Sequence, residues 1–336
     1  MKMRRNFLGM LFSAALVALG SGNAIAADKV SLSFSAGTES NKDGLYYATL
    51  DKLSKELKAR TDDQIKIRIY PNQQLGTEAS MVEGLRSGSV DIAIVGGGNF
   101  ASFVEEFQLF SVPYIFADYD AYRKAMLPDN DVWKLMLGAV TKANLGLRVM
   151  APTTVGSRWV ANTKGTLTNP DDFKKLGLRM RVQANPIEGE VWSLFGAQPV
   201  NMAMPEVVAA MRQGVLQAVE NAPDILYTYK LHEVAKHLTQ TDHSFYVALV
   251  LMSDQAWNKI PENLRPAVQE AFDVTGQYVL DLSQTYQEKA VAAMKAEGAV
   301  VTQADKAAFR KPLEPLYDRV AKEVHAEDLL SAIRAL

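Results

Sequence analysis

The first third of the chain alternates between strand-type and helix-type hydrophobic patterns, and this order limits the fold more than any other feature of the sequence. Residues 30–36 form a short β-prone run, and Ile65, Ile67 and Ile69 alternate with basic side chains, as in a half-exposed strand. Residues 90–95 are almost continuously apolar, as expected of a strand that is covered on both faces. The segment therefore contains three predicted strands.

Two predicted helices separate these strands. In the first, four apolar side chains recur at steps of four, three and four residues and so share one helix face: Tyr46, Leu50, Leu53 and Leu57. The second carries Met81, Val82 and Leu85. A βαβαβ order predicts an α/β fold with a parallel sheet, and such sheets bind ligands at the carboxyl ends of their strands.

The same alternation resumes after about residue 150. Strands are predicted at 178–182 and 216–219, and helices around Ile187, Val191 and Leu194 and around Val207, Val208 and Met211. Residues 261–298 are helix-prone, with only Gly276 interrupting them. Since no Ser/Gly-rich linker divides the chain, we expect it to cross between two intertwined lobes.

Residues 1–26 have the pattern of an export signal. Lys2, Arg4 and Arg5 precede an apolar stretch at 7–19, and Ala24-Ile25-Ala26 supplies a small-x-small cleavage site. The mature protein is expected to begin at Ala27 and to reside in the periplasm. Arg4-Arg5-Asn6-Phe7-Leu8 resembles the twin-arginine motif, and the general secretory and twin-arginine routes both stay open.

Composition excludes several classes of function. The chain has no cysteine, which excludes a thiol nucleophile, a disulfide framework, a cysteine-based zinc site and a lipoprotein anchor. Its formal net charge is −2, without a polybasic run, so no nucleic-acid partner is expected.

Motifs of catalysis are not found either. The chain lacks GxSxG, HExxH and a phosphate-binding loop, and its four histidines (His232, His237, His243 and His325) are interpreted as solvated or capping residues. Glu105-Glu106 is expected to face solvent. Gly96-Gly97-Gly98 fits either a close backbone approach to a ligand or a tight turn. We therefore expect a protein that is not an enzyme and that needs no cofactor or metal.

Two arginines stand inside an apolar strand. Arg179 and Arg181 alternate with Leu178, Met180 and Val182, so both guanidinium groups project from one face of the sheet. They either lie on a solvated face, or one of them enters a cleft and binds a carboxylate through two parallel hydrogen bonds. Periodicity alone does not choose between these interpretations.

A resemblance to a known family does choose. The mature chain, nearly from end to end, resembles the DctP-type solute receptors of TRAP (tripartite ATP-independent periplasmic) transporters, and most of all their sialic-acid-binding branch. Eight segments carry the resemblance by their order and spacing: YPNQQLG at 70–76 with Glu78, GSVD at 88–91, VPY at 112–114, GLRMRV at 177–182, GAQP at 196–199, PEV at 205–207, QAVEN at 217–221 and the surroundings of Trp257.

The resemblance implies a two-lobed periplasmic binding protein fold of the α/β class, with intertwined lobes and a long lobe-spanning helix. The first lobe would comprise residues 27–155 and 247–286, and the second 156–246 and 287–336. Ligand would bind in the cleft between the lobes, which close over it by a hinge motion.

The resemblance also implies a ligand site. Arg181 matches the arginine that pairs with the ligand carboxylate, and Arg158 matches a second ligand-facing arginine. Asn221 matches an asparagine that contacts the acid group, and Glu78 can reach ligand hydroxyls. Met204 and Gly96 stand where the sialic-acid branch has phenylalanine and glutamate, which argues against sialic acid as the ligand. Asn185, Glu39 and Asn99 fall in segments that line the cleft.

The function implied is a monomeric periplasmic receptor that binds a small organic anion and delivers it to TRAP membrane subunits. The two arginines and Glu78, whose charge would repel a second acid group, favour a hydroxylated monocarboxylate such as a sugar acid or hydroxy acid. A sulfonate is an alternative, because arginine also pairs with sulfonate oxygens. A ligand-presenting partner of a receptor kinase would share these residues, whereas a periplasmic enzyme would need a nucleophile, base or metal that the sequence does not show.

Overall fold

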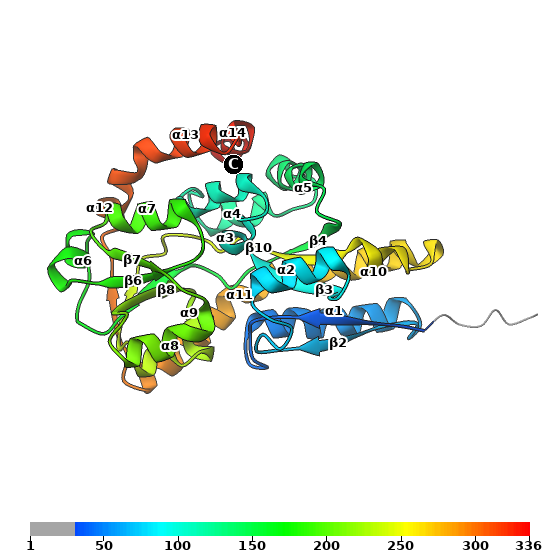
Figure 1. The fold of residues 1–336 in the computed structure, drawn as a ribbon, viewed down its shortest axis with the longest axis horizontal. Coiled ribbons are helices and arrows are strands. Elements are labelled where there is room, and N and C mark those ends of the chain that lie inside the picture. Colours follow the sequence, from blue (N-terminus) through cyan, green and yellow to red (C-terminus); the bar gives the residue numbers. More distant parts are fainter. Residues whose placement is uncertain (1–30) are drawn as a thin grey trace, which may run out of the picture. The chain divides into compact units, whose positions relative to one another are not determined.

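A computed structural model describes residues 31–336 of the chain, and the predicted export signal lies outside the described residues. Strands and helices alternate along the described part, and the strands form two mixed sheets (Figure 1). None of the helices in residues 31–336 is both long and apolar enough to cross a bilayer. The predicted α/β fold class is confirmed, and the strands are divided between two sheets, as expected of a two-lobed fold.

The first sheet has the strand order β2-β1-β3-β10-β4. Its strands are β1 (Leu32–Gly37), β2 (Ile65–Tyr70), β3 (Ile92–Gly96), β4 (Leu147–Thr153) and β10 (Ala248–Ser253). β1 pairs in parallel with β2 and with β3, as the βαβαβ order predicts.

The other half of this sheet lies outside the predicted βαβαβ segment and is not parallel, because β10 is antiparallel to both β3 and β4. The first residue of β10, Ala248, pairs with the last residue of β3, Gly96. The chain returns from the second sheet at the carboxyl end of β3, and it can only continue in the opposite direction.

The second sheet has the order β11-β9-β5-β8-β6-β7. Its strands are β5 (Trp159–Asn162), β6 (Arg179–Val182), β7 (Gln198–Asn201), β8 (Ala218–Asn221), β9 (His237–Gln240) and β11 (Val300–Gln303). β6 is parallel to β7 and β8, whereas β5 is antiparallel to β8 and β9. Each strand falls within the residue ranges predicted for its lobe; the lobe boundaries themselves stay a prediction.

Helices cover both sheets. They are α1 (Leu45–Arg60), α2 (Glu78–Ser87), α3 (Gly97–Phe100), α4 (Tyr119–Ala125), α5 (Asp131–Ala143), α6 (Asp171–Leu176), α7 (Pro186–Leu194), α8 (Met204–Arg212), α9 (Pro223–Thr228), α10 (Asp254–Asn258), α11 (Arg265–Ala296), α12 (Lys306–Arg310), α13 (Glu314–Glu323) and α14 (Glu327–Arg334). The apolar faces predicted for α1 and α2 are buried. Leu194, predicted on the core face of α7, is 48% exposed at the last turn of that helix.

Alternate side chains of the central strands enter two different hydrophobic cores. In β10, Leu249 and Leu251 belong to one core, and Ala248 and Val250 belong to the other. A strand covered on both faces reads as a continuous apolar run, which is why the alternation typical of half-exposed strands is missing here. Both cores include residues of the first and second sheets, so the described part of the chain packs as one unit.

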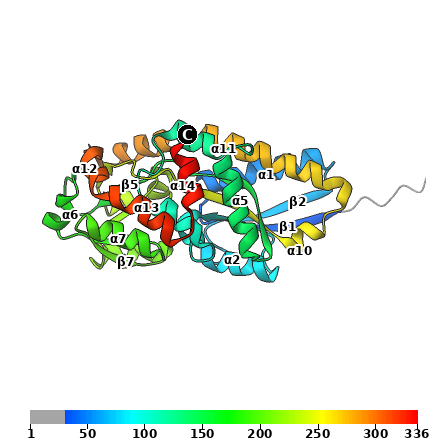
Figure 2. The same ribbon diagram turned by 90° about the horizontal axis from the view of Figure 1, so that it is seen from above.

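The long helix α11 packs against α1 and β4, and also against α9, which follows β8 of the second sheet. Figure 2 shows α11 beside α1. Gly276 faces β4: a β-carbon at this position would lie 3.0 Å from Pro152 Cδ and 3.2 Å from Pro152 O. The glycine that interrupts the helix-prone sequence therefore allows the helix to approach the sheet closely.

The glycine triplet after β3 makes room for side chains. A β-carbon on Gly96 would lie 1.9 Å from the hydroxyl oxygen of Tyr246, and one on Gly98 would lie 2.2 Å from Gln183 Oε1. None of the three glycines has a positive φ, so the turn does not require glycine conformationally. The triplet is explained by the close approach of Tyr246 and Gln183, which donates from Nε2 to the Tyr246 hydroxyl at 3.1 Å.

We predict that Gly96→Ala lowers the free energy of unfolding by about 1–3 kcal/mol, because Tyr246 is buried and has to move. Gly138→Ala is the matched control: Gly138 is an exposed residue of α5 with no atom within 4 Å of an added β-carbon. The control should stabilise the protein by up to about 1 kcal/mol through helix propensity. Denaturant unfolding of both variants measures the difference, and equal effects would contradict the packing described at Gly96.

Candidate functional site

The carboxyl ends of parallel strands from both sheets enclose a cavity of about 130 Å³. Five of the residues predicted to bind ligand line it: Glu39, Glu78, Asn99, Arg181 and Met204. Glu39 follows β1, Glu78 opens α2 after β2, and Asn99 follows β3, whereas Arg181 comes from β6 and Met204 opens α8 after β7. The topology thus collects residues that are far apart in sequence at one place.

Arg181 is a buried guanidinium without an ionic partner. Its side chain is 3% exposed, and its Nε donates to the backbone carbonyl of Met202 at 2.9 Å. Within residues 31–336, no carboxylate forms an ion pair with it and no acceptor receives a hydrogen bond from its two Nη groups. Because buried charges are normally paired, this arrangement is suited to bind an anion from outside the protein.

Arg179, two residues earlier on the same strand, has a different environment. It is exposed, and its Nε donates to Gln217 Oε1 at 3.1 Å while its guanidinium also reaches the carbonyl of Gly214. The two arginines that periodicity could not distinguish are therefore separated by burial: Arg181 lines the cavity and Arg179 lies at the surface.

Glu78 presents one carboxylate oxygen to the cavity. Its Oε2 accepts from Gly96 N (3.0 Å) and from Asn99 Nδ2 (2.7 Å), whereas its buried Oε1 has no hydrogen-bond partner among the described residues. Burial raises the pKa of Glu78, and the two hydrogen bonds partly oppose that rise. The free oxygen is placed to accept a hydrogen bond from a ligand hydroxyl.

Glu39 is the second carboxyl of this cavity. It is 7% exposed, and its loop is fixed by backbone hydrogen bonds to the loop after β2, in which Asn72 N donates to Ser40 O and Gln73 N to Thr38 O, both at 3.0 Å. Burial, and next the negative charge of Glu78, raise the pKa of Glu39 to about 8.

Arg158, predicted as a second ligand-facing arginine, is engaged within the protein. It forms a bidentate buried ion pair with Glu220, whose Oε2 also accepts from His243 Nε2 at 3.2 Å. The adjacent Arg158 and His243 hold the pKa of Glu220 below its usual range despite burial, so this carboxylate is ionised. These residues line a smaller cavity of about 40 Å³.

One nitrogen of Arg158 is still available. Its buried Nη1 has no partner among the described residues, while the guanidinium carbon lies 4.4 Å from the centroid of the Tyr246 ring. The buried hydroxyl of Tyr46 is also without a partner among the described residues. Burial raises the pKa of this hydroxyl, the charge of Glu78 adds to the rise, and the charge of Arg158 opposes it. The two cavities described above and the neighbouring Tyr46 thus contain several buried polar atoms without a partner among the described residues, as in a site that is completed by a ligand.

The two remaining predicted residues have different positions. Asn185 caps α7, because its Oδ1 accepts from Ile187 N and Glu188 N, and its Nδ2 donates to Ser111 Oγ at 2.8 Å. These bonds occupy the amide, and it lines neither of the two cavities described above. Asn221, at the end of β8, is buried and has no described partner for its Nδ2, which leaves that group able to contact an acid.

The interpretation of the histidines as solvated or capping is wrong for two of them. His243 and His232 are 3% and 1% exposed. Each of them has a carboxylate partner. His243 contacts Glu220, and His232 Nε2 lies 2.8 Å from a carboxylate oxygen of Glu297. A lone histidine in sequence gives no sign of such long-range partners. Within residues 31–336 no cluster of three or more potential metal ligands is present.

Sequence reasoning missed Glu220, Glu188 and Tyr46. Glu220 stands between Val219 and Asn221 in the short strand β8, and a carboxylate inside a predicted strand was the available signal. Glu188 is buried in α7, and burial together with the charge of Glu220 raises its pKa to about 8. Tyr46 was assigned to the core face of α1, and only its unpaired hydroxyl marks it as polar.

Loops of the first sheet contact the second sheet directly around the cavity. Leu45 N donates to Asp224 Oδ2 at 3.1 Å, Gln73 Nε2 donates to the Tyr229 hydroxyl at 3.0 Å, and that hydroxyl donates to Glu39 O at 3.3 Å. The walls of the cavity are therefore in contact, and the described arrangement is a closed cleft.

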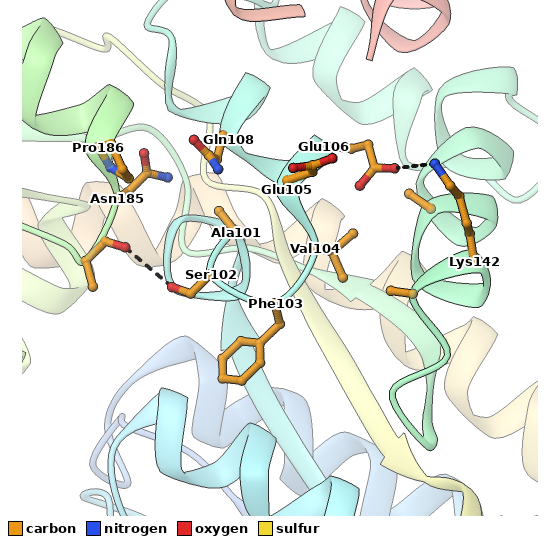
Figure 3. A pocket seen from close by; sticks show the side chains of 13 residues that line it. Ala101, Ser102, Phe103, Val104, Glu105, Glu106, Gln108, Lys142, Asn185 and Pro186 are labelled. Atoms are coloured by element: carbon orange, nitrogen blue, oxygen red, sulfur yellow. Dashed lines mark hydrogen bonds and ion pairs between the residues drawn. The ribbon is translucent and has the colours of Figure 1, made fainter. Parts of the chain in front are cut away.

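A larger, open groove of about 640 Å³ lies elsewhere, between the segment at 101–108, α5 and the start of α7 (Figure 3). Glu105 is exposed, as predicted. Glu106 is half-buried, and its Oε1 lies 3.7 Å from Lys142 Nζ. Of the predicted ligand residues this groove contains only Asn185, and its arginine-free walls offer no buried unpaired cation. On these chemical grounds, the cavity of about 130 Å³ that contains Arg181 is the candidate ligand site.

Comparison with known proteins agrees with this architecture. Residues 36–323 match the family model described as bacterial extracellular solute-binding protein, family 7 (DctP). The chain is 30% identical to the 2,3-diketo-L-gulonate-binding periplasmic protein YiaO of Escherichia coli over 96% of both chains. It is 29% identical to the C4-dicarboxylate-binding periplasmic protein DctP of Rhodobacter capsulatus over 98% of both.

Two solved structures extend the comparison. A TRAP solute-binding protein from a Bordetella species, with density interpreted as pantoate, has a TM-score of 0.83 and 28% identity, covering 90% of this chain and 98% of that one. One from a Polaromonas species, bound to D-erythronate, has a TM-score of 0.82 and 27% identity with the same coverage. The family match spans most of the sequence, and both sheets belong to the matched region. The chain is a member of the DctP family of solute-binding proteins.

Proposed function

We propose that this protein is the periplasmic receptor of a TRAP transporter and that it binds a small hydroxylated monocarboxylate in the closed cleft. The buried, unpaired guanidinium of Arg181 carries the proposal. Arginine stays protonated at every accessible pH, so a guanidinium that is almost completely buried and has no carboxylate partner is suited to pair with an anion from outside the protein. The cavity of about 130 Å³ limits that anion to a small molecule.

The carboxyls of the cavity support the ligand class. Glu39 and Glu78 stand in the same cavity as Arg181, which is the one arginine among its lining residues, so a second acid group on the ligand would be buried without a counterion, whereas ligand hydroxyls would meet carboxyl groups that can form hydrogen bonds with them. Relatives whose printed ligands are 2,3-diketo-L-gulonate, pantoate and D-erythronate fit this pattern. The C4-dicarboxylate-binding relative has a ligand of the other kind, and we do not expect that class for this chain, because Arg181 is the one cation among the residues that line the cavity.

In this function Arg181 would bind the ligand carboxylate with its two free Nη groups. The Met202 carbonyl fixes Nε and thereby orients the planar fork before the ligand arrives. Arg158 is held in the cleft wall by Glu220, and its free Nη1 would add one donor. Closure removes water and strengthens these contacts, and the loaded form would then dock on the membrane subunits as a monomer.

A binding screen tests the function. Pantoate, D-erythronate, D-galactonate and D-glucuronate are titrated into the purified mature protein by calorimetry, together with succinate as a dicarboxylate, ethanesulfonate and a neutral sugar. We expect at least one hydroxylated monocarboxylate to bind and the neutral sugar to give no heat. Preference for succinate would contradict the ligand class, preference for the sulfonate would favour that alternative, and binding of the neutral sugar alone would reject the anion receptor.

We predict that Arg181→Ala weakens binding of the carboxylate by about 2–5 kcal/mol, because the acid group would be buried without its partner. This corresponds to roughly a 30- to 4,000-fold loss of affinity. Arg181→Lys should rescue binding only in part, since an ammonium group keeps the charge but loses the planar fork. Arg179→Ala is the matched control on the same strand, and its exposed side chain predicts little effect. Loss of binding in Arg179→Ala with retention in Arg181→Ala would show that the wrong arginine has been assigned.

A further prediction concerns the buried ion pair. Glu220→Gln should lower the free energy of unfolding by about 3–5 kcal/mol, because it leaves the buried charge of Arg158 without its counterion. Glu323→Gln removes one partner of an exposed bidentate pair with Arg319, at 3.0 Å, and should cost at most about 1 kcal/mol. Denaturant unfolding compares the two variants. A cost for Glu220→Gln as small as that of the surface control would mean that this pair does not hold Arg158.

A further inference from the structure

The walls of the cleft contain more carboxyls than cations. The two cavities described above are lined by Glu39, Glu78, Glu188 and Glu220, but by only two guanidinium groups, those of Arg158 and Arg181. All six side chains are buried, and both arginines act on Glu39, Glu78 and Glu188 electrostatically. An organic anion adds one more negative charge to this space. Ionised carboxylates that are buried without counterions are costly, so part of the charge has to be neutralised.

The carboxyls differ in how well the protein compensates their charge. Glu220 has Arg158 and His243, and Glu78 accepts two hydrogen bonds on Oε2. The side-chain oxygens of Glu39 accept no hydrogen bond from any described residue, since only its backbone carbonyl is bonded, to Tyr229. Glu39 is therefore the carboxyl of the main cavity that has least compensation for a negative charge.

No free cation is left for Glu39 once the ligand is bound. The charged and titratable groups that face it are Glu78 from α2, Arg181 from β6, Arg158 before β5, Asp224 from α9, and the hydroxyls of Tyr46, Tyr229 and Tyr246. Burial raises the pKa of each of these tyrosines, so they stay neutral. Arg158 already serves Glu220, and Arg181 would be taken by the ligand carboxylate.

Resting on the proposed function, we propose that Glu39 takes up a proton from solvent when the cleft closes over the organic anion. The proton binds to a carboxylate oxygen of Glu39, which becomes a neutral carboxylic acid. The receptor thus captures the anion together with one proton, and the Glu39 hydroxyl donates a hydrogen bond to a ligand oxygen. Glu39 then determines specificity, because it selects ligands that present an acceptor at that place.

The direction of the pH dependence follows from the two states. In an open, hydrated cleft the pKa of Glu39 is near its ordinary 4.5, and in the closed cleft burial raises it to about 8. Between these values the closed form holds a proton that the open form lacks. Affinity should therefore rise as pH falls from about 8 to about 4.5, by up to about tenfold per pH unit, and should be independent of Glu39 titration outside that window.

Calorimetry at pH 7 in a series of buffers with different ionisation enthalpies counts the protons. The probes are pantoate, D-erythronate, D-galactonate and D-glucuronate, and every probe that binds is analysed. The slope of the observed enthalpy against the buffer ionisation enthalpy should correspond to uptake of about one proton. Glu105→Gln, which changes an exposed carboxyl outside the cleft, should give the same slope as the unmodified protein.

Glu39→Gln gives the sharpest comparison, because the amide resembles the protonated acid in size, neutrality and ability to donate. Its slope should fall to about zero, and at pH 8 it should bind the probe about tenfold or more tightly than the unmodified protein, which has to take up a proton. Glu78→Gln should keep the slope. Glu188→Gln should keep it as well, because the partners of Glu188 – Gln183 N, which donates to its Oε1 at 3.2 Å, and Glu220 – follow or belong to strands of the second sheet and would stay beside it in an open cleft. Thermal melts check folding, and the buffer series on the unmodified protein does not depend on any variant.

The failures are distinguishable. If none of the four acids binds, the proposed function is rejected and this inference with it. If an acid binds without buffer dependence, or if Glu39→Gln weakens binding at pH 8, the receptor function stands and proton capture is rejected. A slope that persists in Glu39→Gln but disappears in Glu78→Gln or Glu188→Gln overturns the assignment to Glu39.

Discussion

The guanidinium of Arg181 is almost completely buried, and the hydrogen bond that it makes within the described residues runs from its Nε to the backbone carbonyl of Met202. The properties of the cleft depend on this unpaired charge. Arg158, the other buried arginine, is already bound by Glu220, and the bonds of Glu78 to Gly96 and Asn99 fix its carboxylate without pairing it with Arg181. Arg158 is thus paired within the protein and contributes to its stability, whereas Arg181 is left to bind a ligand.

The topology explains how such a site can be assembled and closed. Parallel strands place the loops that follow them at one edge of each sheet, and the two edges face each other across the cavity. The loop that carries Glu39 is fixed by the loop after β2, and Tyr229 of the second sheet donates to the Glu39 carbonyl. The hydrogen bond from Tyr229 links the two halves of the molecule directly beside the cavity. Both hydrophobic cores also include residues of the two sheets.

Local pattern was sufficient for the elements and insufficient for the long-range contacts. The apolar spacing of Tyr46, Leu50, Leu53 and Leu57 located α1 and its buried face, and the continuous run at 90–95 located β3. The direction of β10 depends on where the chain re-enters the first sheet, which no short window contains. In the site, resemblance to a family brought five predicted residues to one cavity, but the partner of Arg158 lies 62 residues away and had no local signature. The burial of His243 could not be predicted either, because it also depends on residues that are distant in the sequence.

An anion receptor whose walls are rich in carboxyls has to reconcile capture with release. A cleft lined by cations alone would bind acids tightly in every state, because strong attraction needs no exact geometry. In the proposed function the attraction depends on closure. Only when water is excluded would the attraction of the ligand to the Arg181 guanidinium exceed its repulsion by the carboxyls of Glu39 and Glu78. When the lobes separate, water hydrates these carboxylates again and their charge repels the ligand. In the proposed function the carboxyls that oppose anion binding would therefore give the open form a low affinity, as release of the ligand to membrane subunits would require.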